Sequence, residues 1–302
     1  VRLVFQNVSC MKKYQYVFYG KHKIYGLENK FRSYDLYESN IPPMLRFMHI
    51  QNLNASGWIE IKDGKYSLCE ESSNTDIAIE AKWTDVKLPD DKLLNDSISN
   101  LKILSFDLEC TSGDGSFPQA SRESDQIIQI GSTFSRNGSE ECYYKHIITL
   151  GSCDAIDGVD VESYETEEEV LLAWRDLIVR EDPDIITGYN IFGFDEPYLN
   201  GRSELFNIEN EFGILSRIKD KVCKFVEQQL SSSALGDNKL KYYNMLGRVQ
   251  IDLMKVVQRD YKLSSYKLDS VAENFLNSKV KKIISSNKIE IDQVKDLSIG
   301  NY

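Results

Sequence analysis

Cysteine pairs, clustered histidines and long apolar runs are all scarce in this sequence of 302 residues. Its six cysteines are widely scattered and no two are spaced as Cys-x-x-Cys. Because no pair has that spacing, a zinc site is not expected, and the cysteines are expected to be the reduced thiols of an intracellular protein. The three histidines stand apart, so none is expected to be a metal ligand. No stretch is long and apolar enough to span a bilayer, which argues against a membrane protein.

An initiator methionine and the three-part layout of a signal peptide are also lacking at the N-terminus. We therefore expect the sequence to be a segment of a longer protein. Its length allows two domains of ordinary size. The polar run at 88–100 is the expected boundary, with 1–97 as part of an N-terminal domain and 98–302 as a second domain.

Basic side chains are few in the middle of the chain. Residues 101–200 carry 21 acidic and six basic side chains, although the whole chain has a net charge of only −11. A nucleic-acid-binding face is normally basic, so this balance argues against a plain DNA-binding module. It still allows an acidic catalytic site that recruits cations, because bound metals would invert the local field.

Two carboxylates sit one residue apart at the end of the apolar run 101–109. Alternation along a strand would point Leu104, Phe106 and Leu108 into a core and place Asp107 and Glu109 together on the opposite face. Like charges so close are costly unless a cation or a proton separates them. The pair is therefore a candidate site for a hard cation such as Mg²⁺, which prefers oxygen ligands.

Hydrophobic periodicity and turn signals predict further elements. Two strands are expected to form an antiparallel meander with 101–109, and the clearest helix begins with three glutamates at 167–169. The predicted elements are strands at 126–131, 142–148, 185–188 and 248–253, helices at 167–178, 208–235 and 268–276, and a hairpin in which 57–61 and 65–68 flank Asp63-Gly64.

Asp195 follows the strand at 185–188 and can begin a helix. A strand–helix–strand pattern could bring it to Asp107 and Glu109. Two-metal phosphoryl chemistry uses such a cluster, with three or four carboxylates around two ions roughly 3.5–4 Å apart. On spacing alone, an ordinary structural role for the three acids is equally open.

Five stretches, in order, resemble family B DNA polymerases. Residues 106–110, Phe-Asp-Leu-Glu-Cys, resemble the first exonuclease motif, and 188–199 resemble the second, Tyr-Asn-x₃-Phe-Asp-x-Pro-Tyr-Leu. Residues 37–40 together with 45–48, then 247–253 and then 258–268, resemble the delta-type branch. The irregular sequence between the motifs points to a large DNA virus of eukaryotes.

The resemblance implies an α/β fold, a ribonuclease H-like exonuclease domain with a mixed sheet and flanking helices, preceded by part of a β-rich α+β N-terminal domain. It implies a proofreading 3′–5′ exonuclease that uses two Mg²⁺ (or Mn²⁺) ions. The implied partners are a DNA primer-template, its single-stranded 3′ end, the polymerase domain of the same chain and a sliding clamp. The implied location is a site of viral or nuclear DNA replication.

Residue by residue, Asp107, Glu109 and Asp195 match the metal-binding carboxylates of the family. Asn190 and Phe194 match positions that line the single-stranded 3′ end, where an aromatic face would stack on a base. Plain core packing is an equally open reading of Phe194. Asp252 lies on a motif strand and is expected to be structural.

The third exonuclease motif of the family, Tyr-x₃-Asp, is missing from the sequence. We expect it beyond residue 302, so the isolated chain is predicted to be weakly active or inactive. Two alternatives stay open at this point: a free-standing exonuclease, and a non-catalytic scaffold with the same fold.

Overall fold

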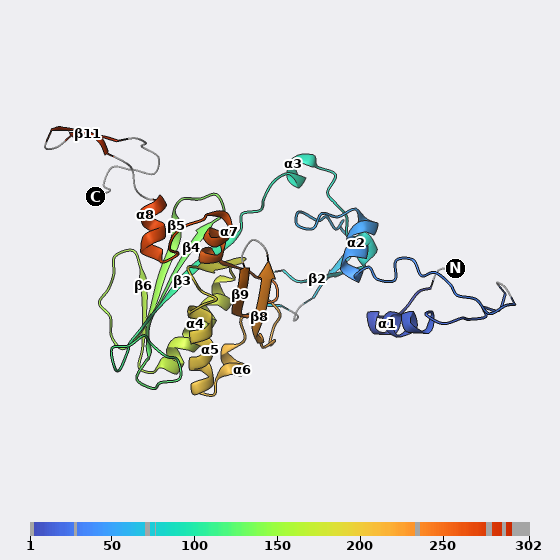
Figure 1. Cartoon of the computed structure of the whole chain (residues 1–302), viewed down its shortest axis with the longest axis horizontal. Coiled ribbons are helices and arrows are strands. Elements are labelled where there is room, and N and C mark those ends of the chain that lie inside the picture. The colour runs from blue at the N-terminus through green and yellow to red at the C-terminus, as the bar shows by residue number, and fades with distance from the viewer. Residues whose placement is uncertain are drawn as a thin grey trace. The chain divides into compact units, whose positions relative to one another are not determined.

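The computed structural model describes residues 3–26, 29–69, 73–75, 77–232, 236–275, 280–285 and 288–291. The chain divides into two compact units (Figure 1), Val1–Glu70 with Ile77–Ile98, and Glu71–Asp76 with Ser99–Tyr302. None of the helices in the described ranges combines the length and apolarity needed to cross a membrane.

The first unit holds short elements: α1 (Val8–Val17), α2 (Pro43–Gln51), β1 (Tyr66–Leu68), β2 (Ile79–Ala81), the 3₁₀ helix η1 (Trp83–Asp85) and α3 (Lys92–Asn95). The prediction of a β-rich unit is wrong for its described residues, where two three-residue strands stand beside helices of ten, nine and four residues.

The hairpin predicted around Asp63-Gly64 is also wrong in its pairing. The turn forms, with Gly64 at φ 74°, but β1 pairs antiparallel with β2, placing Ser67 opposite Glu80. Glu60 instead forms an isolated bridge with Lys87. A local turn signal cannot specify the partner of so short a strand, because the partner comes from a distant part of the chain.

The second unit is built on a six-stranded mixed sheet with the order β10-β7-β3-β4-β5-β6. The strands are β3 (Lys102–Cys110), β4 (Ile127–Arg136), β5 (Cys142–Leu150), β6 (Asp160–Tyr164), β7 (Ile185–Gly188) and β10 (Val249–Asp252). Strands β3, β4 and β5 pair antiparallel, which confirms the predicted meander. Strands β7 and β10 extend it in parallel beyond β3, and β6 lies parallel to β5 at the other edge.

Helix α4 (Glu167–Glu181) packs on one face of this sheet. Thr166 and Glu169 form a capping box at its start, and three glutamates occupy its first turn. The apolar stripe is buried, and its Trp174 ring lies 4.8 Å from that of Phe106 on β3. The helix predicted at 167–178 is therefore confirmed. The other helices in the described part of this unit are α5 (Asp195–Leu205), α6 (Glu209–Phe212), α7 (Leu253–Asp260) and α8 (Leu268–Phe275). Residue 276, the last of the helix predicted at 268–276, lies outside the described residues.

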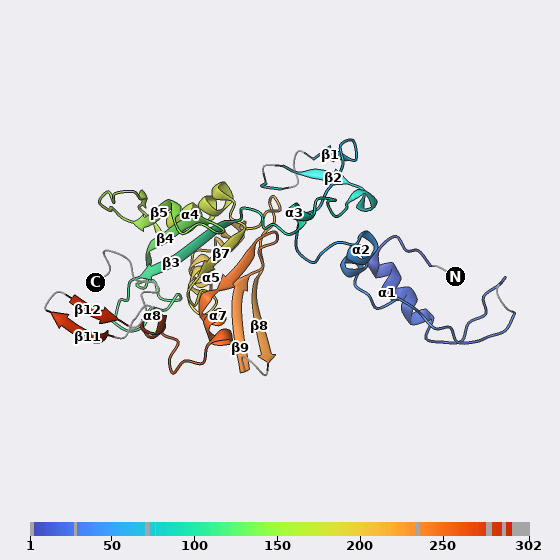
Figure 2. The same cartoon turned by 90° about the horizontal axis from the view of Figure 1, so that it is seen from above.

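The helix predicted over 208–235 is wrong. Of its described residues, 208–232, only those of α6 are helical. Strand β8 (Phe225–Ser232) pairs antiparallel with β9 (Gly236–Tyr243), and the two lie side by side in Figure 2. Polar residues suggested a helix, but Glu227 finds cross-strand partners in Lys239 and Lys241. A further pair, β11 (Val280–Ser285) and β12 (Lys288–Ile291), follows α8.

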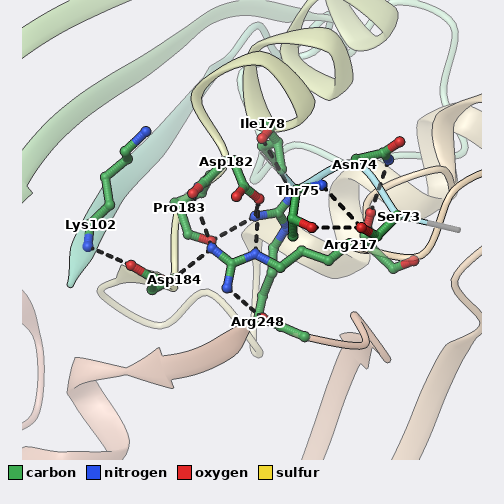
Figure 3. A network of polar contacts seen from close by, with 12 residues as sticks. Ser73, Asn74, Thr75, Lys102, Ile178, Asp182, Pro183, Asp184, Arg217 and Arg248 are labelled. Carbon is green, nitrogen blue, oxygen red and sulfur yellow. Dashed lines mark hydrogen bonds and ion pairs between the residues drawn. The ribbon is translucent and has the colours of Figure 1, made fainter. Parts of the chain in front are cut away.

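Two arginines, Arg217 and Arg248, donate hydrogen bonds to the turn that follows α4 (Figure 3). Arg248, 7% exposed, donates to Asp182 Oδ1 and to the carbonyl of Pro183, each at 2.7 Å. Arg217 donates to Asp182 Oδ1 at 2.9 Å and to Asp184 Oδ1 at 2.7 Å. Because Arg248 directly precedes β10, this network holds the strand that ends at Asp252.

Candidate active site

Strand β3 presents its two carboxylates as the alternation predicts. Leu104, Phe106 and Leu108 are buried, whereas Asp107 and Glu109 lie on the exposed face. The parallel neighbour β7 ends close by at Gly188. A Cβ on Gly188 would lie 2.7 Å from the backbone oxygen of Phe106, so this close approach requires glycine.

The third acid is joined to the same strand by a hydrogen bond. Asp195 is the first residue of α5 and is 2% exposed. Its Oδ1 accepts a hydrogen bond from the backbone N–H of Leu108 at 3.2 Å. Since Leu108 lies between Asp107 and Glu109, the fold brings Asp195 to the strand that carries the other two carboxylates.

The electrostatics of these acids are unfavourable without a cation. Burial raises the pKa of Asp195 to about 7, and the charge of Asp107 adds to this rise. Although Asp107 lies on the exposed face, partial desolvation raises the pKa of its carboxyl, and the charge of Glu109 raises it further. The charge of Glu109 therefore opposes the ionisation of Asp107, and the charge of Asp107 opposes that of Asp195, which is the situation that a bound divalent cation relieves.

The chemistry of this donor set fits a hard divalent cation, because all three side chains supply carboxylate oxygens. Across the described residues, however, no three His, Cys, Asp or Glu side chains lie close enough together to hold a metal ion. The structure thus brings the three acids to one strand end but does not gather them into a coordination shell.

The second predicted group, Asn190 and Phe194, lies on the loop between β7 and α5. Asn190 has a left-handed backbone, with φ 63°, and its carbonyl accepts from the N–H groups of Gly193 and Phe194, both at 2.9 Å. A Cβ on Gly193 would lie 2.2 Å from Asn190 Oδ1, so glycine leaves room for the carboxamide. The loop is a tight turn that leads directly to Asp195.

Phe194 belongs to a row of three aromatic rings. Its ring lies 5.3 Å from that of Phe117 and 5.2 Å from that of Tyr198. Phe117 comes from the loop after β3 and is 73% exposed, whereas Tyr198 is buried. Sequence reasoning missed Phe117, although an aromatic residue in a Gly/Ser-rich loop beside two carboxylates is a signal that could have found it.

Two buried charged side chains bind the backbone of the loop that carries Phe117. Asp125 is fully buried and accepts hydrogen bonds from Gly113 N at 3.0 Å and Gln119 N at 2.9 Å. These bonds, that from Gly113 first, lower the pKa of Asp125. Arg202, also fully buried, donates to the carbonyl oxygens of Ala120 and Arg122. The loop is therefore preorganised.

The fold and the site define a mixed α/β domain with an acidic strand end beside an aromatic row. Residues 34–271 match the family described as DNA polymerase family B, exonuclease domain. The chain belongs to this family, which confirms the family expected from the five motifs.

Several relatives are similar over most of this chain. The DNA polymerase of Acanthamoeba polyphaga mimivirus is 36% identical over 351 aligned residues, which cover 93% of this chain and 20% of the relative. The DNA polymerase delta catalytic subunit of Dictyostelium discoideum is 40% identical over 262 residues, covering 85% and 23%. The DNA polymerase of Pyramimonas orientalis virus is 30% identical over 435 residues, covering 100% and 35%. The chain thus spans between a fifth and about a third of the length of these relatives.

Proposed function

We propose that this chain carries the proofreading 3′–5′ exonuclease region of a DNA polymerase. The reaction is hydrolysis of the 3′-terminal phosphodiester of DNA, with residues 98–302 forming a ribonuclease H-like domain and 1–97 forming part of an N-terminal domain. The observation that carries the proposal is the hydrogen bond from Leu108 N to Asp195, which joins a third carboxylate to the strand of Asp107 and Glu109.

Each group of residues then has a role. Asp107, Glu109 and Asp195 would hold Mg²⁺ or Mn²⁺, and a bound pair of ions supplies an activated water and compensates the charge on the leaving oxygen. Asn190 and Phe194 bind the single-stranded 3′ end, and Phe117 extends the stacking surface beside them.

The proposed partners follow from this role. They are a DNA primer-template, the polymerase domain of the same chain and a sliding clamp, at a site of viral or nuclear DNA replication.

The decisive experiment measures shortening of a 5′-labelled single strand while Mg²⁺ or Mn²⁺ is titrated. The full-length protein that contains this chain should shorten the strand from its 3′ end, and Asp107→Ala should abolish that activity. Asp157→Ala, which removes an exposed acid elsewhere, is the matched control. If the 302-residue chain alone shortens the strand in a metal-dependent way, a free-standing exonuclease is favoured. If the full-length protein does not shorten the strand, a non-catalytic scaffold is favoured.

We expect Phe117→Ala to weaken binding of single-stranded DNA about fivefold, because a stacked base contributes ~1–3 kcal/mol and this ring lies at the exposed end of the row. The unfolding free energy should change little, since the side chain is 73% exposed. Fluorescence anisotropy with a labelled oligonucleotide measures the affinity. Tyr143→Ala removes a 48% exposed ring on β5 and serves as control; equal affinities of both variants would contradict the assignment.

A further inference from the structure

Asp252 is a buried carboxylate that bonds outside its own element. It is 2% exposed and stands at the end of β10, at the N-cap of α7. Its Oδ1 accepts from the N–H of Met254 at 2.9 Å, which is the ordinary capping bond. The same oxygen accepts from Asn190 N at 2.9 Å, and Oδ2 accepts from Phe192 N at 3.2 Å.

The two bonds to Asn190 and Phe192 are not needed to cap α7. They cross from the edge strand to the loop between β7 and α5, which begins next to Gly188, the Cα partner of Asp252 in the parallel pair. Arg248 and the network around Asp182 hold the other end of the same strand. Asp252 therefore lies on a strand that is bonded at both ends, and its carboxylate binds the loop through two hydrogen bonds.

The position of this loop decides where two groups of the site lie. The carbonyl of Asn190 accepts from Phe194 N at 2.9 Å, and that of Ile191 accepts from Glu196 N at 2.9 Å. The backbone that Asp252 holds therefore sets the first turn of α5, where Asp195 is the first residue. Displacement of the loop would move both Asn190 and Asp195 relative to β3.

A carboxylate is the side chain that these partners demand. All three are N–H donors, and an ionised Asp offers two acceptor oxygens and no donor. Asn would point an NH₂ group at one of them, and Ser, although an equally good cap, has one oxygen and a shorter reach. The carboxylate also has an electrostatic cost: the pKa of Asp195 is raised by burial, then by the charge of Asp107 and, to a smaller degree, by the charge of Asp252.

We propose that Asp252 is a positioning residue, which holds the Asn190–Phe192 backbone and thereby places Asn190 and Asp195 for removal of the 3′-terminal nucleotide. This inference rests on the proposed function and replaces the purely structural role expected from the sequence.

The test compares Asp252→Ser and Asp252→Asn with Asp91→Ser. Asp91 is the matched control because it caps α3 through the N–H groups of Leu93 and Leu94. Two experiments are made. The first measures hydrogen exchange of the Asn190 and Phe192 amides in the 302-residue chain, and the second measures kcat and KM for shortening of a 3′-mismatched strand by the full-length protein.

We expect Asp252→Ser to speed exchange at both amides at least about tenfold and Asp252→Asn to speed it at one of them. In both variants kcat should fall about 10- to 100-fold, as for groups that orient ligating residues, while Asp91→Ser leaves the exchange rates and the kinetic constants unchanged. Wild-type exchange at both amides in Asp252→Ser, or wild-type kcat despite faster exchange, would overturn the inference. If Asp252→Ser does not fold, Asp252→Asn decides on the same criteria.

Failure of the proposed function would look different. The unsubstituted full-length protein would then not shorten the strand at all, while the amide exchange would still show whether Asp252 holds the loop.

Discussion

Replacing Arg202 with Met is expected to lower the free energy of unfolding by about 3–5 kcal/mol, because it leaves a buried carboxylate without its cation. Arg202 and Glu167 are 0% and 3% exposed. Arg202 Nε donates to Glu167 Oε1 at 2.7 Å and its Nη2 donates to Oε2, so the pair is bidentate. The variant also loses the two bonds that fasten the loop at Ala120 and Arg122.

Urea unfolding followed by circular dichroism measures this loss. Arg180→Met is the matched control, since Arg180 is half-exposed and its pairing with Glu162 spans 3.7 Å, an arrangement that contributes little. The double variant Arg202→Met/Glu167→Leu should recover part of the stability, because it also removes the buried Glu167 carboxylate that Arg202→Met leaves unpaired. A loss below about 1 kcal/mol in Arg202→Met would show that Glu167 does not depend on this partner.

Asp195→Asn should stabilise the metal-free protein at pH 8 and at the same time abolish removal of the 3′-terminal nucleotide. The pKa of Asp195 is raised from 3.8 to about 7 in the folded protein, first by burial and then by Asp107. The folded state therefore binds this proton more tightly than the unfolded state does. That contribution to stability is complete below pH ~4 and is lost as the pH rises through about 7.

Asparagine carries no charge to bury, yet its Oδ1 can still accept the hydrogen bond from Leu108 N. We expect the free energy of unfolding of the variant to exceed that of the wild type by about 1–3 kcal/mol at pH 8, with a smaller difference at pH 4.5. Its rate of shortening DNA should fall at least about a hundredfold, since even groups that only orient metal ligands contribute 10- to 100-fold.

Urea unfolding at both pH values in EDTA, repeated with Mg²⁺, provides the measurement. Added Mg²⁺ should stabilise the wild type and leave Asp195→Asn unchanged. Asp157→Asn, at an exposed position, controls for loss of one negative charge. Equal stability of wild type and Asp195→Asn at pH 8 would show that the carboxylate is not held under repulsion.

Local patterns were sufficient where burial follows a regular period. The alternation in 101–109 correctly separated Leu104, Phe106 and Leu108 from Asp107 and Glu109, because a strand has one face toward the core. The three glutamates and the apolar stripe correctly indicated α4. The same reasoning failed for the segment around Glu227, whose helical composition is overridden by cross-strand partners more than ten residues away.

Local sequence patterns were enough to identify the family, the strand that carries Asp107 and Glu109, and the motif loop that carries Asn190 and Phe194. These features depend on near neighbours in the chain, so periodicity and motif order suffice to reveal them. The folded chain was needed to show that Asp195 accepts a hydrogen bond from Leu108, that Phe117 lies against Phe194, and that Asp252 bonds to the motif loop. Those pairs are brought together by strand order and by buried hydrogen bonds between distant segments, which no local pattern encodes.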